Sequence, residues 1–184
     1  MTAFADETPP SRSRSLRTGL EWVAIIAGAL LAALAVKTWL FQPFYIPSPS
    51  MHPTLKVDDR VLVAKRSTHP GRGDIVVFKR PPGVVEGPLN KDLIKRVIGL
   101  PGETVEGRDN QVFVNDRALT EPYLPERTVI SDFSKTTLKQ GQYWVMGDNR
   151  GNSQDSRVFG PIDQDLIVGR AFLLFWPLGD FGRL

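Results

Sequence analysis

The chain has 184 residues, 41% of them hydrophobic and 23% charged, with no cysteine, two histidines and a formal net charge of +3. That length fits one anchor and one compact domain, while the cysteine and histidine counts exclude disulfides and thiolate sites and argue against a histidine metal site. Much of the positive excess lies in the N-terminal arm and no dense Lys/Arg stripe follows, so we expect no nucleic-acid partner. We also expect no metal and no organic cofactor.

The N-terminal part of the sequence predicts a tail and a membrane anchor. Residues 1–19 are rich in Ser, Thr, Pro and Arg without apolar periodicity, which predicts a disordered cytoplasmic tail. Residues 20–41 are predicted as a transmembrane helix, because 23–36 is an uninterrupted apolar run flanked by Trp22 and Trp39. Those tryptophans would lie about 25 Å apart along a helix, close to the thickness of a bilayer core. Arginines before the segment place the N-terminus in the cytoplasm and everything after it outside.

Two other interpretations of the apolar segment stay open. It could be a cleavable signal peptide, since Ala33-Leu34-Ala35 has the small-x-small pattern of a cleavage site. It could also be a buried core helix. Its length and its flanking residues favour the uncleaved anchor.

The sequence after the anchor predicts a mainly antiparallel β domain over residues 42–184. Short runs rich in Val, Ile, Phe and Tyr are separated by Gly, Pro, Asn and Asp, and no helical pattern of 10–15 residues alternates with them. Gly83–Pro88 and Pro122–Phe133 are predicted as surface loops. The predicted strands are 61–64, 74–78, 93–98, 111–114, 143–146 and 167–176.

The run Ser48-Pro49-Ser50 is a candidate nucleophile segment. Prolines fix φ and stiffen the backbone, and a pre-positioned hydroxyl loses less entropy when it attacks. A Pro/Ser linker is the alternative, but nearby apolar residues such as Phe44 and Met51 are unusual in a free linker. With so few histidines in the chain, a lysine is the leading candidate to take the proton of Ser50.

Lys95 is the best-placed lysine for that role. If 93–98 is a strand, Leu93, Lys95 and Val97 share one face, and apolar neighbours on both sides can exclude water from the amine. Burial disfavours the charged form, and a neutral amine can accept the proton of a serine. The alternative is a strand whose basic residues point to water.

A dense polar loop over residues 147–157 follows the strand 143–146. Its acidic positions do not match an EF-hand, so the alternatives are a plain hydrogen-bonded turn or a functional loop. In the functional interpretation Ser153 orients the lysine amine, while Asp155 and Arg157 form an ion pair.

A Ser/His/Asp triad of Ser50, a histidine and Asp148 is a competing hypothesis. His52 is only two residues from Ser50, which is poor geometry in an extended segment, and His69 lies in a predicted turn.

Taken in order, these segments resemble the bacterial type I signal peptidases, also called leader peptidases. The resemblance extends from the anchor to Pro177. It is carried by four blocks: Ile46-Pro47-Ser48-x-Ser50-Met51-x-Pro53-Thr54-Leu55, Gly73-Asp74-Ile75-Val76-Val77-Phe78, Asp92-x-Ile94-Lys95-Arg96-Val97-Ile98-Gly99-Leu100-Pro101-Gly102-Glu103 and Gly147-Asp148-Asn149-Arg150-x-Asn152-Ser153-x-Asp155-Ser156-Arg157.

The resemblance implies a fold and a set of site residues. The fold is an antiparallel, partly barrel-like β domain preceded by one transmembrane helix. Ser50 corresponds to the nucleophile, Lys95 to the general base, Ser153 to the residue that orients the lysine, and Ser48 to an oxyanion-hole hydroxyl that acts with the Ser50 N–H. The implied substrate-pocket residues are Phe44, Ile46, Pro47, Met51, Leu55, Leu93 and Ile94, and the implied structural-loop residues are Asp148, Asn149, Arg150, Asp155 and Arg157.

The resemblance also implies an activity and partners. We expect a membrane-bound serine endopeptidase that removes signal peptides with small residues at positions −1 and −3 from exported preproteins. Its partners would be the lipid bilayer and the protein export machinery, and it would cross the plasma membrane once with its catalytic domain outside. Ala33-Leu34-Ala35 would be a self-cleavage site, and Gly151 departs from the acidic or polar residue that the family often has there.

Two rival functions remain at this stage. One is a self-cleaving Ser–Lys peptidase of the repressor type, which would need a regulatory module. The other is an anchored binding domain without activity, which would leave Ser50, Lys95 and the 147–157 loop without a common purpose.

Overall fold

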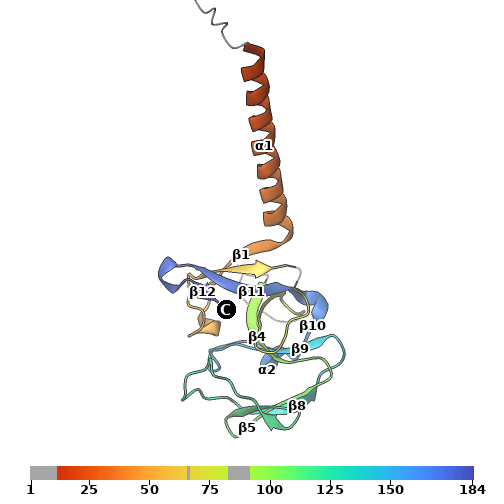
Figure 1. Ribbon diagram of the computed structural model, residues 1–184. Coiled ribbons are helices and arrows are strands. Elements are labelled where there is room, and N and C mark those ends of the chain that lie inside the picture. The colour runs from red at the N-terminus through yellow and green to blue at the C-terminus, as the bar shows by residue number, and fades with distance from the viewer. Residues whose placement is uncertain (1–11, 66, 83–91) are drawn as a thin grey trace, which may run out of the picture. The chain divides into compact units, whose positions relative to one another are not determined.

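The computed structural model describes residues 12–65, 67–82 and 92–184 (Figure 1). The loop predicted over 83–88 and residues 1–11 of the predicted tail lie outside the described residues. The chain divides into two compact units, Met1–Trp39 and Leu40–Leu184, and each is described by itself.

The N-terminal unit contains one helix, α1 (Arg12–Trp39). It begins before the predicted residue 20, because a helix propagates into flanking residues that tolerate helical structure. It ends at Trp39, before the predicted residue 41. Within the described residues no helix is long and apolar enough to cross a membrane, in contrast to the transmembrane helix expected over 20–41. The exposed large apolar side chains of α1 include Leu20, Trp22, Val23, Ile25, Ile26, Leu30, Leu31, Leu34 and Trp39.

The second unit is built from two antiparallel sheets. The larger sheet has the strand order β1-β2-β11-β3-β4-β9-β10, with β12 paired to β11. In the described residues its first and last strands do not pair with each other, so the sheet is not a closed barrel. Its strands are β1 (Phe41–Tyr45), β2 (Arg60–Ala64), β3 (Ile75–Lys79), β4 (Asp92–Gly99), β9 (Gln142–Met146), β10 (Ile162–Asp163), β11 (Ile167–Trp176) and β12 (Gly182–Arg183).

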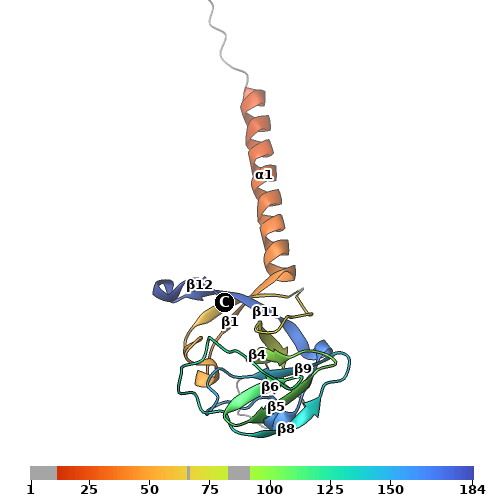
Figure 2. The same ribbon diagram turned by 60° about the horizontal axis from the view of Figure 1, so that its bottom comes forward.

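The smaller sheet has the order β7-β6-β5-β8. Figure 2 shows β5, β6 and β8 grouped together. Its strands are β5 (Thr104–Arg108), β6 (Gln111–Val114), β7 (Arg117–Ala118) and β8 (Phe133–Thr137), and the short helices of the unit are η1 (Pro49–Met51), α2 (Ser156–Phe159), η2 (Gln164–Leu166) and η3 (Leu178–Asp180).

The prediction of a mainly antiparallel β domain is confirmed, and all six predicted apolar runs contain strands. Some strands were not predicted from the sequence pattern, and for two of them the cause is local. β8 is largely polar and exposed, so no alternating apolar signal marks it. β1 contains Pro43, which is tolerated because β1 is an outer strand of its sheet.

The larger sheet packs apolar side chains on both faces, and this positions β4 deep in the unit. Ile75, Val77 and Ile94 belong to one hydrophobic cluster, whereas Val76 and Phe78 belong to a second. This alternation is that of a strand buried on both sides. Because β4 pairs with β3 on one edge and with β9 on the other, its side chains have no open edge toward water.

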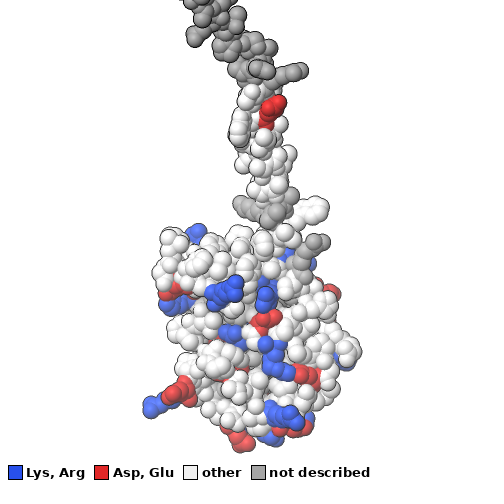
Figure 3. All heavy atoms as spheres, viewed as in Figure 1, with Lys and Arg blue, Asp and Glu red and all other residues white. Residues whose placement is uncertain are grey.

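Charges of both signs are interspersed on the face of this unit shown in Figure 3. Several charged residues of the unit are in ion pairs, such as Lys56 with Asp180 and Lys135 with Asp116. Pairs this exposed contribute little to stability. On the face that the figure shows, this mixture is unlike the one-sign stripe that binds nucleic acid.

Candidate active site

Lys95 lies in the middle of β4 and is only 3% exposed. It pairs with Val76 of β3, and the pairing of Arg96 with Met146 places Lys95 opposite Gly147, one step beyond the end of β9. Its neighbours on the same face, Leu93 and Val97, pack in the second hydrophobic cluster. The lysine therefore points into the unit rather than to water.

Ser50 lies in the single turn η1 and is 7% exposed. The next residue, Met51, is fully buried in the first hydrophobic cluster, and its burial holds the turn against the core. Lys95 Nζ donates a hydrogen bond of 2.7 Å to Ser50 Oγ. The hydroxyl of Ser48 donates to the same oxygen over 3.3 Å, so a lysine and two serines meet at one point.

Gly147 closes this site from the side of the 147–157 loop, and the sequence analysis did not single it out. A Cβ at this glycine would lie 2.2 Å from Ser153 Oγ and 2.5 Å from the carbonyl oxygen of Ser50. Only a residue without a side chain fits there. Ser153 thus lies beside the Ser50 segment, and its buried Oγ is close enough to the Asp155 carboxylate to contribute to the lowered pKa of Asp155.

The loop is also tied directly to the nucleophile segment. The Asn149 N–H donates to the Ser50 carbonyl over 3.0 Å, and Asn149 Nδ2 donates to the Pro49 carbonyl over 3.1 Å. These bonds fix the backbone on both sides of the Ser50 side chain. Gly151, by contrast, has open space where a Cβ would lie, so this departure from the family pattern is sterically neutral.

Asp155 holds the two ends of the loop together. Its carboxylate accepts from Arg157 Nε and Nη2 over 2.9 and 2.8 Å, and from the Gly147 N–H over 2.9 Å. Burial raises the pKa of Asp155, but the hydrogen bond and charge of Arg157 and the Gly147 N–H outweigh it, so the pKa lies below its usual value. The carboxylate stays charged and clamps the loop at neutral pH.

Asp148 is engaged by partners other than a histidine. Arg96 donates to both of its carboxylate oxygens, over 2.9 and 2.6 Å, and the Thr54 hydroxyl donates over 2.5 Å. His52 is exposed, and His69 contacts Gln164 at 2.8 Å. This arrangement does not support the competing Ser/His/Asp triad.

Within the described ranges no three acidic, histidine or cysteine side chains converge as a metal site would require.

The residues expected to line substrate pockets are only partly brought together. Four of them, Ile46, Met51, Leu55 and Ile94, are buried in the first hydrophobic cluster, with Phe44 packed against it. Pro47 is exposed. Leu93 packs on the opposite face of the sheet, in the second cluster, because successive residues of a strand alternate between faces.

Known proteins resemble this chain along most of its length. A signal peptidase I T from Bacillus subtilis is 36% identical, over 94% of this chain and 93% of that protein. A signal peptidase I from Leptolyngbya laminosa is 37% identical, over 97% and 92%. A signal peptidase IB from Staphylococcus aureus is 35% identical, over 88% and 92%.

A crystal structure of a signal peptidase I from Enterococcus faecalis matches 55% of this chain and 95% of its own, with 35% identity and a TM-score of 0.46. The family model described as signal peptidase, peptidase S26, matches residues 19–176. The chain therefore belongs to the signal peptidase family, peptidase S26, and is a peptidase.

Proposed function

We propose that this peptidase removes N-terminal signal peptides from exported preproteins, with Ser50 as nucleophile and Lys95 as general base. The observation that carries the proposal is the 2.7 Å contact between Lys95 Nζ and Ser50 Oγ. A general base must lie within hydrogen-bond reach of the proton that it takes, and this pair meets that requirement. The names of the relatives supply the substrate class.

The burial of Lys95 supports its role as the base. An amine removed from water favours its neutral form, which can take the proton of Ser50 as Oγ attacks the scissile carbonyl. The lysine then passes that proton to the departing amine, and the signal peptide remains as an ester on Ser50. A water deprotonated by Lys95 attacks the ester, and the proton returns to Ser50 Oγ as the signal peptide leaves.

Two further serines have supporting roles in this mechanism. Ser48 Oγ lies 3.3 Å from the attacking oxygen, so its hydroxyl and the Ser50 N–H can bind the oxyanion that forms on the carbonyl. The Ser153 hydroxyl is buried beside Gly147, and Gly147 lies opposite Lys95 in the register of β4 and β9. Because a hydroxyl both donates and accepts hydrogen bonds, Ser153 can accept a bond from the lysine amine and orient it.

The packing around Ser50 supports a preference for small side chains. Ile46, Met51 and Leu55 are fully buried beside the nucleophile segment and leave little space there. Small residues at positions −1 and −3 of a signal peptide would fit a shallow binding surface of this kind, with the peptide extended along the edge of a strand.

Exposed aromatic residues support attachment of the second unit to a bilayer. Tyr45 of β1 and Trp176 of β11 both pair with Arg60 of β2, and Arg60 lies 5.9 Å from the Trp176 ring. Leu178 and Phe181 are exposed shortly after Trp176. Aromatic side chains beside a cation suit the membrane–water interface. We therefore propose an enzyme bound to the plasma membrane, with α1 as its anchor, the domain outside and the export machinery nearby.

The test of the dyad uses the full chain in vesicles and a preprotein whose new N-terminus is read by mass spectrometry. Ser50→Ala should abolish cleavage without lowering the unfolding temperature. Lys95→Arg should also abolish cleavage, because a guanidinium stays charged at any workable pH, and it should lower the unfolding temperature because it buries a larger charged group. Lys135→Arg, at an exposed lysine paired with Asp116, is the matched control and should cleave normally. Normal cleavage by Ser50→Ala would reject the proposal.

A further inference from the structure

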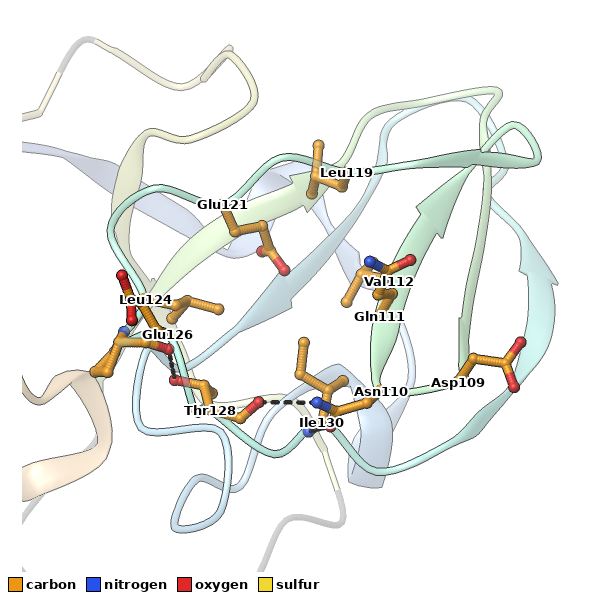
Figure 4. Close-up of a pocket in the computed structure, with 11 residues that line it drawn as sticks. Asp109, Asn110, Gln111, Val112, Leu119, Glu121, Leu124, Glu126, Thr128 and Ile130 are labelled. Carbon is orange, nitrogen blue, oxygen red and sulfur yellow. Dashed lines mark hydrogen bonds between the residues drawn. The ribbon is translucent and has the colours of Figure 1, made fainter.

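The segment between β7 and β8 reaches the active-site loop through Glu121 and Tyr123. Figure 4 shows Glu121 pointing inward from this segment, into a pocket of about 340 Å³ that is also lined by Leu124 and Val112. The sequence analysis assigned no role to Glu121 and placed Tyr123 in a surface loop. Both residues instead contact arginines that hold the 147–157 loop.

Glu121 binds Arg150 in a buried ion pair. The side chains are 6% and 0% exposed, respectively. Arg150 Nη1 donates to Glu121 Oε2 over 2.9 Å and Nη2 donates to Oε1, while Arg150 Nε donates over 3.1 Å to the carbonyl of Gly147. A buried guanidinium without its carboxylate would be strongly unfavourable. Glu121 therefore keeps in place the arginine that holds the Gly147 carbonyl.

Tyr123 connects the same carboxylate to a second arginine. Its hydroxyl donates to Glu121 Oε1 over 2.6 Å, and its ring centre lies 3.9 Å from the Arg96 guanidinium. Arg96 in turn binds both carboxylate oxygens of Asp148. Two adjacent loop residues, Gly147 and Asp148, are thus supported from one short segment.

Gly147 has no spare room, which links this support to the chemistry. Ser153 Oγ and the Ser50 carbonyl both lie within 2.5 Å of where its Cβ would be. The Gly147 backbone therefore lies close to both Ser153 and the Ser50 carbonyl, and the N–H of Asn149, two residues later, donates to the same carbonyl. Catalytic groups misplaced by about 1 Å can cost on the order of 100-fold in rate.

We propose that Glu121 and Tyr123 are positioning residues for the peptidase reaction: through Arg150 and Arg96 they hold Gly147 and Asp148, and so keep Ser153 against Ser50 and Lys95. This inference rests on the proposed function. The rival explanation is that the ion pair serves only folding, in which case its loss lowers stability and leaves the folded enzyme unchanged.

The experiment measures kcat and KM of the full chain on a signal-peptide reporter across a pH range, at a temperature where thermal unfolding shows each variant folded. Glu121→Gln should lower kcat by roughly 10- to 100-fold and change KM by less than about 2-fold, because the scaffold for substrate binding is untouched. Since the proposed base is a buried amine, we expect activity to rise with pH, and a loosened 147–157 loop that admits water to Lys95 should move this rise to higher pH. Tyr123→Phe, which removes only the hydroxyl, should act in the same direction with a smaller loss.

Glu103→Gln is the matched control. Glu103 also forms a partly buried ion pair, with Arg72, and accepts the Leu100 N–H over 2.7 Å, but it does not contact the 147–157 loop. It should lower the unfolding temperature and leave kcat and the pH profile unchanged.

Three results would overturn the inference: wild-type kcat in folded Glu121→Gln, a kcat loss in Glu103→Gln equal to that in Glu121→Gln, or wild-type kcat in Tyr123→Phe should Glu121→Gln fail to fold. Ser50→Ala in the same assay separates the two proposals. If Ser50→Ala is inactive while Glu121→Gln retains full kcat, only the positioning role is rejected. If Ser50→Ala cleaves, the proposed function itself is rejected.

Discussion

Gly147→Ala is the most informative small change in this molecule, because one methyl group would meet two of the proposed catalytic residues, Ser50 and Ser153. The added Cβ would come to 2.2 Å from Ser153 Oγ, 2.6 Å from Ser153 Cβ and 2.5 Å from the Ser50 carbonyl oxygen. The first contact can be relieved by a rotation of the Ser153 side chain. The third is with backbone and cannot be relieved that way, so the nucleophile segment or the loop must move.

The magnitude follows from those contacts. Overpacking a filled site costs about 1–3 kcal/mol, and in a chain of this size each kcal/mol lowers the unfolding temperature by roughly 2–4 °C. Displacing Ser50 or Ser153 should lower kcat by about 100-fold or more, which is a larger effect than the stability loss alone can produce. The assay is preprotein cleavage by the full chain in vesicles, paired with thermal unfolding of the same sample.

Gly151→Ala in the same loop is the matched control. No atom lies within 4 Å of the Cβ that it would add, and its backbone is not in the left-handed region. It should retain wild-type cleavage and stability. Wild-type kcat in Gly147→Ala would refute the reasoning, because it would mean that neither Ser50 nor Ser153 must stay where the structure has them.

Three further outcomes are expected. Ser48→Ala should lower kcat by about 10²- to 10³-fold while KM stays near wild type, as for the loss of one oxyanion donor, and an unchanged kcat would remove Ser48 from the mechanism. Because the folded-state pKa of Asp155 lies below its unfolded value, Asp155 stabilises the fold above about pH 4 and loses this effect as pH falls through the folded pKa. Asp155→Asn should therefore lower the urea-derived free energy of unfolding at pH 7, with a difference that shrinks toward pH 3; a pH-independent difference would contradict this. Trp176→Ala should weaken binding of the Leu40–Leu184 unit to anionic vesicles, measured by sedimentation, whereas Val129→Ala, at another exposed apolar residue, should not.

Local patterns predicted the parts of this molecule that depend on local physics. The strands around Lys95 and before Gly147 follow from short β-branched runs bounded by turn residues, and the buried face of Lys95 follows from its apolar neighbours at i ± 2. The candidate catalytic residues came from residue chemistry combined with the family resemblance.

The rest depends on contacts between distant segments, which no local pattern reveals. Thr54 and Asp148 are 94 residues apart in the sequence, and Glu121 and Arg150 are 29 apart. Pocket residues were expected on both faces of β4, although a strand can present only every second residue to one side, so Leu93 and Ile94 separate. A glycine after a strand predicts a turn, and only the folded chain shows that a missing side chain makes room for a serine.

The different supports of Lys95 and Ser50 have a consequence for how the activity of this enzyme responds to heat. Lys95 lies on a strand bonded along both edges, whereas Ser50 lies in a single turn after the outermost strand β1, tethered by Asn149. Local opening reaches the periphery of a sheet at lower free energy than its interior. On heating, the segment around Ser50 should detach from the rest of the unit and return while the sheet stays folded. Cleavage should therefore be lost reversibly at temperatures below the cooperative unfolding transition. Amide exchange would then show a fast-exchanging Ser50 segment beside a β4 that is protected until the whole unit unfolds.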